Sequence, residues 1–268
     1  MAASRIHAGS DVELLVSASI LGADYLHLGD AIHLAEVSGS DLLQLDVADG
    51  IFVPTITFGE GLAKLIREAT SLPLEVHLMV SRPGDWIPVM ADLGADFVLF
   101  HAEAVSRLHA TVEQARMHGL GIGVALNTET PPTAVEYVLP YIDLVTVMAI
   151  LPGFAGQPFV PGTLNKIAAL RTLIDASAKP DVLIEVDGGI KPNNVSEVVS
   201  AGADIVAVSS AIYSSENPRS AVRDLKDRAA RVFRDPERAD RIRQSSFVRR
   251  MHSRRFPVGA SRDAISSS

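Results

Sequence analysis

The chain has 268 residues, of which 47% are hydrophobic, so it can bury a large core, and its length alone does not require two domains. It has no cysteine, which excludes disulfides and thiolate metal sites and fits a reducing compartment. No apolar run reaches the roughly 18 residues that span a bilayer. The N-terminal sequence MAASRIHAGSDVE lacks the apolar segment of a signal peptide. We therefore expect a soluble, cytoplasmic protein with no membrane partner.

The net charge of −8 is unevenly distributed along the chain. From Arg219 to the C-terminus there are 13 arginines and one lysine against six acidic residues, so this part carries about +8 and the preceding part about −16. A basic segment can bind nucleic acid or a membrane surface. Aromatic residues that would stack on bases are not interleaved with these arginines. We expect the arginines to pair with acids of the same segment, of the acidic part or of another subunit, and we expect no nucleic-acid partner.

Short apolar runs alternate along the chain with segments whose apolar residues recur at i, i+3 and i+4, such as 109–120 and 162–177. The runs predict strands at 14–21, 42–47, 73–80, 96–101, 121–127, 143–150, 182–187 and 204–210. Before two of these strands the sequence reads Gly-Ala-Asp, and glycine suits the C-terminal end of the preceding helix.

Eight such units with nearly continuous apolar strands predict a parallel sheet closed into a (β/α)8 TIM barrel, an α/β fold. The alternative is an open doubly wound sheet, but no G-x-G-x-x-G follows the first strand and the eight even repeats favour closure. We expect the barrel to form a catalytic domain over residues 1–220, with a C-terminal helical or flexible extension over 221–268. In the extension, residues 227–250 have a helical pattern that is broken near Pro236, and 251–268 resemble a loose tail rich in serine and arginine.

In such barrels the active site lies at the C-terminal ends of the strands. The side chains predicted there are Ser19, Gln44, Asp46, His77, Met79, His101, Asn127, Met148, Asp187, Ser209 and Ser210. Taken singly, a strand histidine such as His101 or a methionine is more often a core residue than a functional one. Asp46, His77 and Asp187, however, share one barrel end and one face of their strands. Because unpaired buried charges are costly, we expect these three to converge on a cation, a substrate or each other.

Three consecutive late loops carry signals for phosphate binding. They are PGFAGQPF at 152–159, Gly188 and Gly189 after the seventh strand, and SSAIY at 209–213, which could begin a short helix. Any one of these three loops, taken alone, is explained by a tight turn. Barrel enzymes, however, often bind phosphate between the loops after strands seven and eight, so together the loops predict a phosphorylated substrate.

Several segments, in order along the chain, resemble the ribulose-phosphate 3-epimerase family. They are SASILGADYLHLGD, LDVADGIFVPTITFG, LPLEVHLMVSRP, GVALNTETP, LPGFAGQPFVPGTLNKI, IEVDGGI and AGADIVAVSSAIY, and they cover nearly all of residues 14–215. The sequence from about residue 220 onward lies outside the resemblance.

The resemblance implies an isomerase of carbohydrate metabolism that epimerises a pentose phosphate at C3 through an enediolate. In that family a divalent metal ion (Zn, Mn, Fe, Co or Mg) is held by two histidines and two aspartates, and the aspartates act as acid and base. Carried over, Asp46 and Asp187 are the acid/base pair and, with His77, metal ligands. The substrate-binding residues implied are Ser19, Gln44, His77, Met79, Met148, Gly153, Gly156, Gly188, Gly189, Ser209 and Ser210. We also expect a homo-oligomer.

The sequence departs from the family pattern at several positions close to the expected site. Gln44 stands where the family has its first metal-ligating histidine. The other departures are Gly22 for serine, Ala48 for methionine, Thr128 for proline, Leu151 for asparagine, Ala155 for glycine and Ser209 for glycine. Their position indicates a paralogue with a changed substrate or a changed metal requirement.

Gln44 leaves three interpretations open. Its amide oxygen could still bind a metal, which would favour Mg²⁺ or Mn²⁺ over Zn²⁺ and weaken the site. The site could instead bind no metal, with the amide donating to the substrate oxygen. Third, the protein could be a non-catalytic sugar-phosphate-binding module, although two buried carboxylates argue against that. A lyase or decarboxylase that passes through the same enediolate is a further alternative for the reaction.

Overall fold

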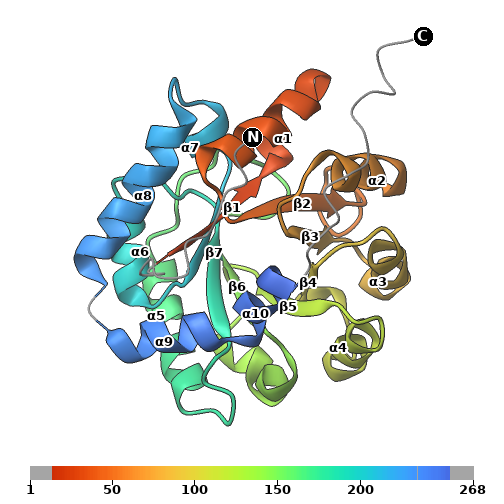
Figure 1. Ribbon diagram of the computed structural model, residues 1–268. Coiled ribbons are helices and arrows are strands. Elements are labelled where there is room, and N and C mark those ends of the chain that lie inside the picture. Colours follow the sequence, from red (N-terminus) through yellow and green to blue (C-terminus); the bar gives the residue numbers. More distant parts are fainter. Residues whose placement is uncertain (1–13, 234, 254–268) are drawn as a thin grey trace.

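The computed structural model describes residues 14–233 and 235–253. Its eight strands form a closed parallel barrel in chain order, and β1 pairs with β8 (Figure 1), so the predicted (β/α)8 barrel is confirmed over the open sheet. The strands are β1 Leu15–Ser19, β2 Leu42–Ala48, β3 Leu74–Met79, β4 Phe97–His101, β5 Gly121–Leu126, β6 Leu144–Met148, β7 Leu183–Asp187 and β8 Ile205–Val208. Each lies within, or one residue beyond, the range predicted for it.

Helices surround the barrel (Figure 1). They are α1 Leu28–Ser38, α2 Glu60–Ala69, α3 Pro83–Asp92, α4 Leu108–Met117, α5 Thr163–Asp175, α6 Val195–Ala201, α7 Ser210–Tyr213, α8 Pro218–Val232, α9 Pro236–Gln244 and α10 Ser246–Ser253. Between β5 and β6 the connection is instead a 3-10 segment, η4 Pro132–Tyr141. Pro131, Pro132 and Pro140 supply no backbone N–H, which disfavours a regular α-helix there. None of the described helices is long and apolar enough to cross a membrane.

The alternation of side chains along the strands separates two packing regions. Leu43, Leu45 and Val47 of β2 belong to the large apolar cluster between barrel and helices. Their neighbours Gln44 and Asp46 are also buried, but they lie level with Glu75 and His77 of β3. Residues that alternate with Leu43, Leu45 and Val47 therefore fill the barrel interior, which is polar toward the C-terminal ends of the strands.

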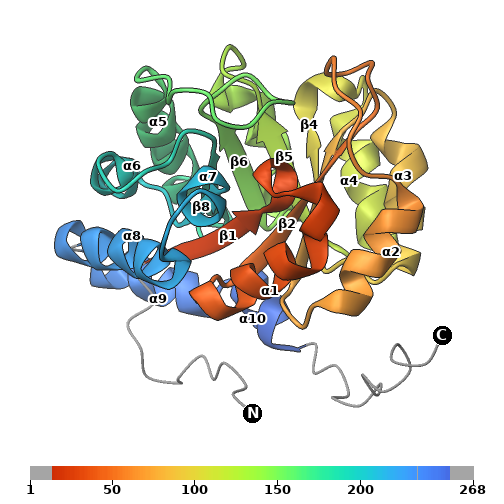
Figure 2. The same ribbon diagram turned by 90° about the horizontal axis from the view of Figure 1, so that it is seen from above.

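The opposite end of the barrel is apolar and is covered by the C-terminal helices. Leu15, Leu42, Phe97, Leu144, Leu183 and Ile205, which begin or nearly begin their strands, form one cluster with Ile242, Phe247, Val248 and Met251 of α9 and α10. The Phe97 and Phe247 rings stack with centroids 4.1 Å apart. Figure 2 shows α8 to α10 as a blue run along the lower edge of the molecule. The helices α9 and α10 thus form the floor of the barrel, at the opposite end of the strands from their polar ends.

The C-terminal part does not separate from the barrel at residue 220. The expected boundary between residues 220 and 221 falls inside α8, whose Val222, Leu225 and Ala229 are buried in the large core cluster. The predicted interruption near Pro236 is confirmed, because α8 ends at Val232 and Pro236 is the first residue of α9. The tail predicted for 251–268 lies mostly outside the described residues.

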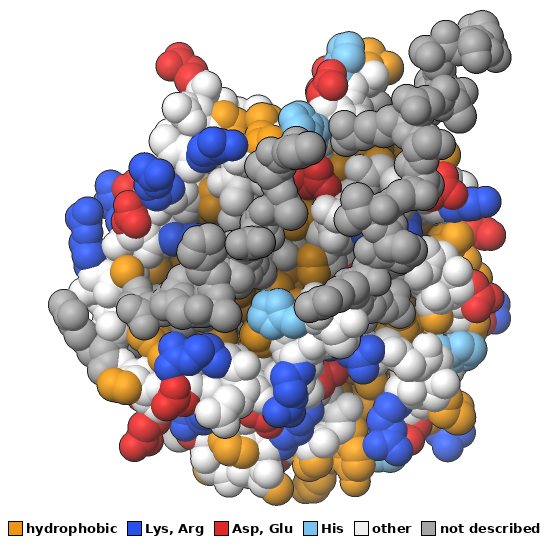
Figure 3. Space-filling model, in the orientation of Figure 1, with side chains coloured by type: hydrophobic (Ala, Val, Ile, Leu, Met, Phe, Trp, Pro, Cys, Tyr) orange, Lys and Arg blue, Asp and Glu red, His pale blue; other side chains and the backbone are white. Residues whose placement is uncertain are grey.

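Arginines of this part pair with acids, as expected. The buried Arg238 Nε lies 2.8 Å from Asp204 Oδ1, and Arg238 also donates to backbone carbonyls of Val199 and Ala203. Arg241 lies 3.5 Å from Asp175 of α5. On the face shown in Figure 3, basic and acidic side chains are interspersed. These pairs tie the C-terminal helices to the barrel.

Candidate active site

Three predicted site residues meet at the C-terminal end of the barrel. His77 Nδ1 lies 3.0 Å from Asp46 Oδ1 and 3.6 Å from Asp187 Oδ2. One donor atom from each residue falls within 4.8 Å of the others. Parallel register explains the meeting, because Asp46 is level with His77 and all three strands end on the same side. The prediction that the three side chains converge is confirmed.

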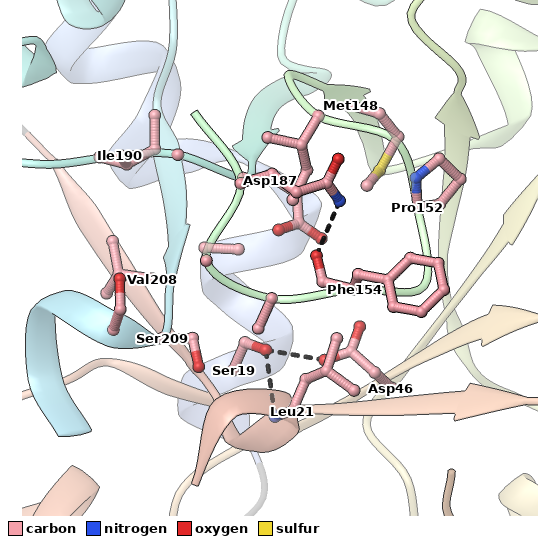
Figure 4. A pocket seen from close by; sticks show the side chains of 18 of the residues that line it. Ser19, Leu21, Asp46, Met148, Pro152, Phe154, Asp187, Ile190, Val208 and Ser209 are labelled. Carbon is pink, nitrogen blue, oxygen red and sulfur yellow. Dashed lines mark hydrogen bonds between the residues drawn. The ribbon is translucent and has the colours of Figure 1, made fainter. Parts of the chain in front are cut away.

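Asp46 is held as a hydrogen-bond acceptor. Ser19, the last residue of β1, donates its hydroxyl to Asp46 Oδ2 at 2.7 Å, while Oδ1 faces His77. Both carboxylate oxygens therefore have a donor. The side chain of Ser19 also accepts from the backbone N–H of Leu21, a weak contact at 3.4 Å that orients the hydroxyl (Figure 4).

Asp187 has a different environment. Burial raises its pKa to about 7, and the negative charge of Asp46 adds to the effect, while His77 and a hydrogen bond from Gln44 act in the opposite direction. For His77, burial opposes the charged form, but the hydrogen bond to Asp46 and the surrounding carboxylates raise the pKa overall. The Asp187 carboxyl group therefore takes up and releases its proton near neutral pH.

Gln44 hydrogen-bonds to one of the two aspartates. It is fully buried, and its Nε2 donates to Asp187 Oδ2 at 3.3 Å. Its Oε1 is buried without a hydrogen-bond partner among the described residues. The amide N–H is therefore directed at the Asp187 carboxylate, and the unpaired carbonyl oxygen could serve as a ligand atom.

A second pair of acids lies one layer deeper in the barrel. Glu75 and Glu185 precede His77 and Asp187 by two residues and are fully buried. Glu75 accepts from Ser17 at 2.9 Å and Glu185 from Thr146 at 2.8 Å. Burial raises the pKa of Glu75 to about 7 and that of Glu185 well above its ordinary value. These two carboxyl groups therefore hold their protons at pH values well above the ordinary range for glutamate.

His101 belongs to the same network of buried polar side chains. From the sequence, a single histidine in a strand was interpreted as a core residue. Its Nε2 lies 2.9 Å from His77 Nε2, and its Nδ1 lies 3.5 Å from Glu103 Oε2. Burial lowers the pKa of His101 to about 4, so the ring is neutral. Glu103 was not predicted at all. The sequence signal for Glu103 was its position two residues after His101, in the segment HAEA at the end of the fourth strand.

A pocket opens above the aspartates and encloses about 610 Å³, part of it open to solvent. Eleven residues predicted for the site line it: Ser19, Asp46, Met79, Met148, Gly153, Gly156, Asp187, Gly188, Gly189, Ser209 and Ser210. Two further predicted residues, Gln44 and His77, are buried and do not line it. The loop that carries Pro152 and Phe154 curves around the pocket (Figure 4).

The glycines after β7 are required by the backbone. Gly188 and Gly189 have φ of 106° and 69°, values that favour glycine. A Cβ on Gly188 would lie 2.2 Å from Ile150 Cγ1, and one on Gly189 would lie 2.6 Å from the Phe159 backbone nitrogen. The β7 loop therefore packs directly against the β6 loop. Together they form one wall of the pocket, with Lys191 also on its lining.

Two of the departures from the family pattern are in contact with each other. Ser209 Oγ accepts from the Gly22 backbone N–H at 3.0 Å. A Cβ at Gly22 would lie 2.6 Å from Ser209 Oγ and 3.4 Å from Ala155 Cβ. The absence of a side chain at residue 22 thus makes room for the hydroxyl of Ser209 beside the pocket.

The residues present fit a divalent cation. Asp46, His77 and Asp187 provide two carboxylates and an imidazole nitrogen that already face one another. The orphaned buried Oε1 of Gln44 adds a neutral oxygen, a donor that suits hard cations.

The closed barrel and its pocket, with two carboxyl groups and an imidazole at the strand ends, define a (β/α)8-barrel protein equipped for acid–base chemistry. The model of the ribulose-phosphate 3 epimerase family matches residues 15–213. The ribulose-phosphate 3-epimerase of Bacillus subtilis is 40% identical over 211 residues, covering 79% of this chain and 97% of that protein. The chloroplastic ribulose-5-phosphate-3-epimerase of Arabidopsis thaliana is 40% identical over 227 residues, 84% of this chain and 80% of that protein. The chain belongs to the ribulose-phosphate 3-epimerase family.

Solved structures of more distant proteins have the same fold. A 3-hexulose-6-phosphate synthase from Salmonella typhimurium matches with a TM-score of 0.59 and 19% identity, covering 81% of this chain and 99% of the other. Orotidine 5'-phosphate decarboxylase from Pyrococcus horikoshii matches with a TM-score of 0.58 and 17% identity, over 81% and 99% of the two chains. At these identities the likeness concerns the barrel alone.

Proposed function

We propose that the protein is an epimerase of a phosphorylated ketose, with ribulose 5-phosphate as the substrate to test. The observation that carries the proposal is the placement of Asp46 and Asp187, from β2 and β7, at the base of one pocket whose wall is built from glycine-bearing loops. The identity of about 40% to curated epimerases supports it.

The two aspartates divide the proton transfer between them. Asp46 accepts two hydrogen bonds and serves as the base, while Asp187, with a pKa of about 7, holds a proton that it can give. Inversion at a carbon beside a carbonyl needs one group to remove a proton from one face and another to return one to the opposite face. In the reverse reaction the two roles exchange.

The pocket wall binds the rest of the substrate. The backbone at Gly153, Gly156, Gly188, Gly189, Ser209 and Ser210 would surround the phosphate, and Lys191 adds a positive charge to that wall. Met79 and Met148 are nearly inaccessible and line the pocket beside the carboxylates, where they exclude water from the reacting carbon.

Asp46, His77, Asp187 and the carbonyl oxygen of Gln44 would hold a divalent cation. When bound, such a cation stabilises negative charge on the substrate oxygen as the proton leaves. The amide in place of an imidazole favours Mg²⁺ or Mn²⁺ over Zn²⁺. Gln44 itself orients Asp187 through the N–H that it donates.

Exchange of the substrate's carbon-bound hydrogen in D₂O, followed by NMR with ribulose 5-phosphate, tests the proposal. We expect the wild type to exchange the hydrogen at C3. The Asp187→Asn variant should lose exchange by at least about 100-fold while remaining folded, because the group that gives the proton is removed. Asp92→Asn makes the same chemical change at an exposed residue of α3 and should not alter the rate. Wild-type protein that exchanges no ketose phosphate would refute the epimerase proposal.

A further inference from the structure

His77 and His101 meet edge to edge inside the barrel. Their Nε2 atoms are 2.9 Å apart, whereas their ring centroids are 5.0 Å apart and their planes are inclined by 22°. The nitrogen edges therefore face each other, nearly in one plane. Both side chains are fully buried. At this distance one nitrogen must carry a proton and the other must accept it, since two lone pairs would repel each other.

Glu103 decides which nitrogen carries the proton. Its Oε1 accepts from the backbone N–H of Asn127 at 2.8 Å and from the hydroxyl of Thr130, so this carboxylate acts as an ionised acceptor. Its Oε2 lies 3.5 Å from His101 Nδ1. A lone pair on that buried nitrogen would face a negative charge, whereas an N–H is attracted to it. His101 therefore has its proton on Nδ1, and its Nε2 accepts from His77.

We propose that Glu103 and His101 are positioning residues that fix the tautomer of His77, keeping its Nε2 protonated and its Nδ1 directed at Asp46 and Asp187. With Nε2–H donated to His101, Nδ1 is the nitrogen that faces Asp46 and donates to it, and a cation would take the place of that proton. A cation at Nδ1 then leaves the ring with its remaining proton already on Nε2. Histidine ligands in proteins commonly donate their second ring N–H to such a partner, and loss of the partner weakens metal binding.

This inference rests on the cation site of the proposed function, but its first test needs neither substrate nor turnover. Long-range ¹H–¹⁵N correlation NMR on the metal-free full chain, with His77 assigned by comparison with His77→Asn, reports which ring nitrogens carry protons. We expect His77 to be protonated at Nε2 and His101 at Nδ1 only. A neutral His77 protonated at Nδ1 alone would overturn the proposal, whatever the outcome of the exchange assay.

The second test is the affinity for Mn²⁺, measured by calorimetry. His101→Leu removes the acceptor and should weaken binding about 10- to 100-fold. His101→Gln places a carbonyl oxygen near the position of Nε2 and should bind within about threefold of the wild type. Equal affinity of His101→Leu and the wild type would overturn the proposal, as would wild-type protein that binds none of Mn²⁺, Co²⁺ and Zn²⁺. If His101→Leu does not fold, the tautomers observed in the wild type still decide the question.

Discussion

Glu75→Gln should make the metal-free protein more stable above neutral pH. The fully buried Glu75 accepts from Ser17 in a barrel interior that also holds Glu185. The glutamine has nearly the same shape, and its oxygen can still accept from Ser17. The substitution therefore removes the titrating group and leaves the packing in place.

The magnitude follows from the pKa of Glu75, which burial raises from 4.5 to about 7. At pH values between 4.5 and about 7, Glu75 holds a proton in the folded protein that it releases in the unfolded chain. The contribution of Glu75 to the free energy of unfolding therefore falls as the pH rises through this range. A difference of about 2.5 in pKa corresponds to about 3 kcal/mol, lost in full above pH 7. Glu75→Gln removes this loss, and it also removes the negative charge that raises the pKa of Glu185.

Urea unfolding of metal-free protein at pH 5, 6, 7 and 8, followed by circular dichroism, measures the effect. We expect the variant to match the wild type near pH 5 and to exceed its free energy of unfolding by up to about 3 kcal/mol at pH 8. Glu68→Gln removes one negative charge from an exposed position of α2 and is the control. A stability difference between Glu75→Gln and the wild type that is the same at pH 5 and pH 8 would refute the reasoning.

Two other predictions concern opposite ends of the barrel. Phe247→Ala should lower the free energy of unfolding by about 3–5 kcal/mol in urea titrations, because it empties the floor beneath Phe97. The exchange rate of the folded enzyme should stay unchanged, and Tyr137→Ala, at an 89% exposed residue, should affect neither quantity. Gln44→Leu should weaken Mn²⁺ binding about tenfold at pH 7 in calorimetry, since it removes both the proposed ligand oxygen and the N–H donated to Asp187. Binding equal to that of the wild type would show that the amide does not take part.

The local pattern of the sequence was sufficient for the fold and for the main site residues. Apolar runs at regular intervals predicted all eight strands, and the period of two predicted that Asp46, His77 and Asp187 share the barrel interior. The helix break at Pro236 also followed from the sequence, because proline cannot donate a backbone hydrogen bond within a helix. These properties depend on residues close together in the chain.

The partners of individual atoms depended on the tertiary structure. Gln44 and Asp187 are 143 residues apart, so only closure of the barrel shows that the amide N–H meets this carboxylate while its oxygen stays unpaired. The same holds for the contact of His77 with His101 and for Phe247 beneath the barrel. Alternation along a strand determines which face a side chain occupies, but the atom it meets depends on the register of neighbouring strands and on its rotamer. For that reason the sequence alone determined the class of chemistry in this protein, and the tertiary structure decided how its groups are oriented.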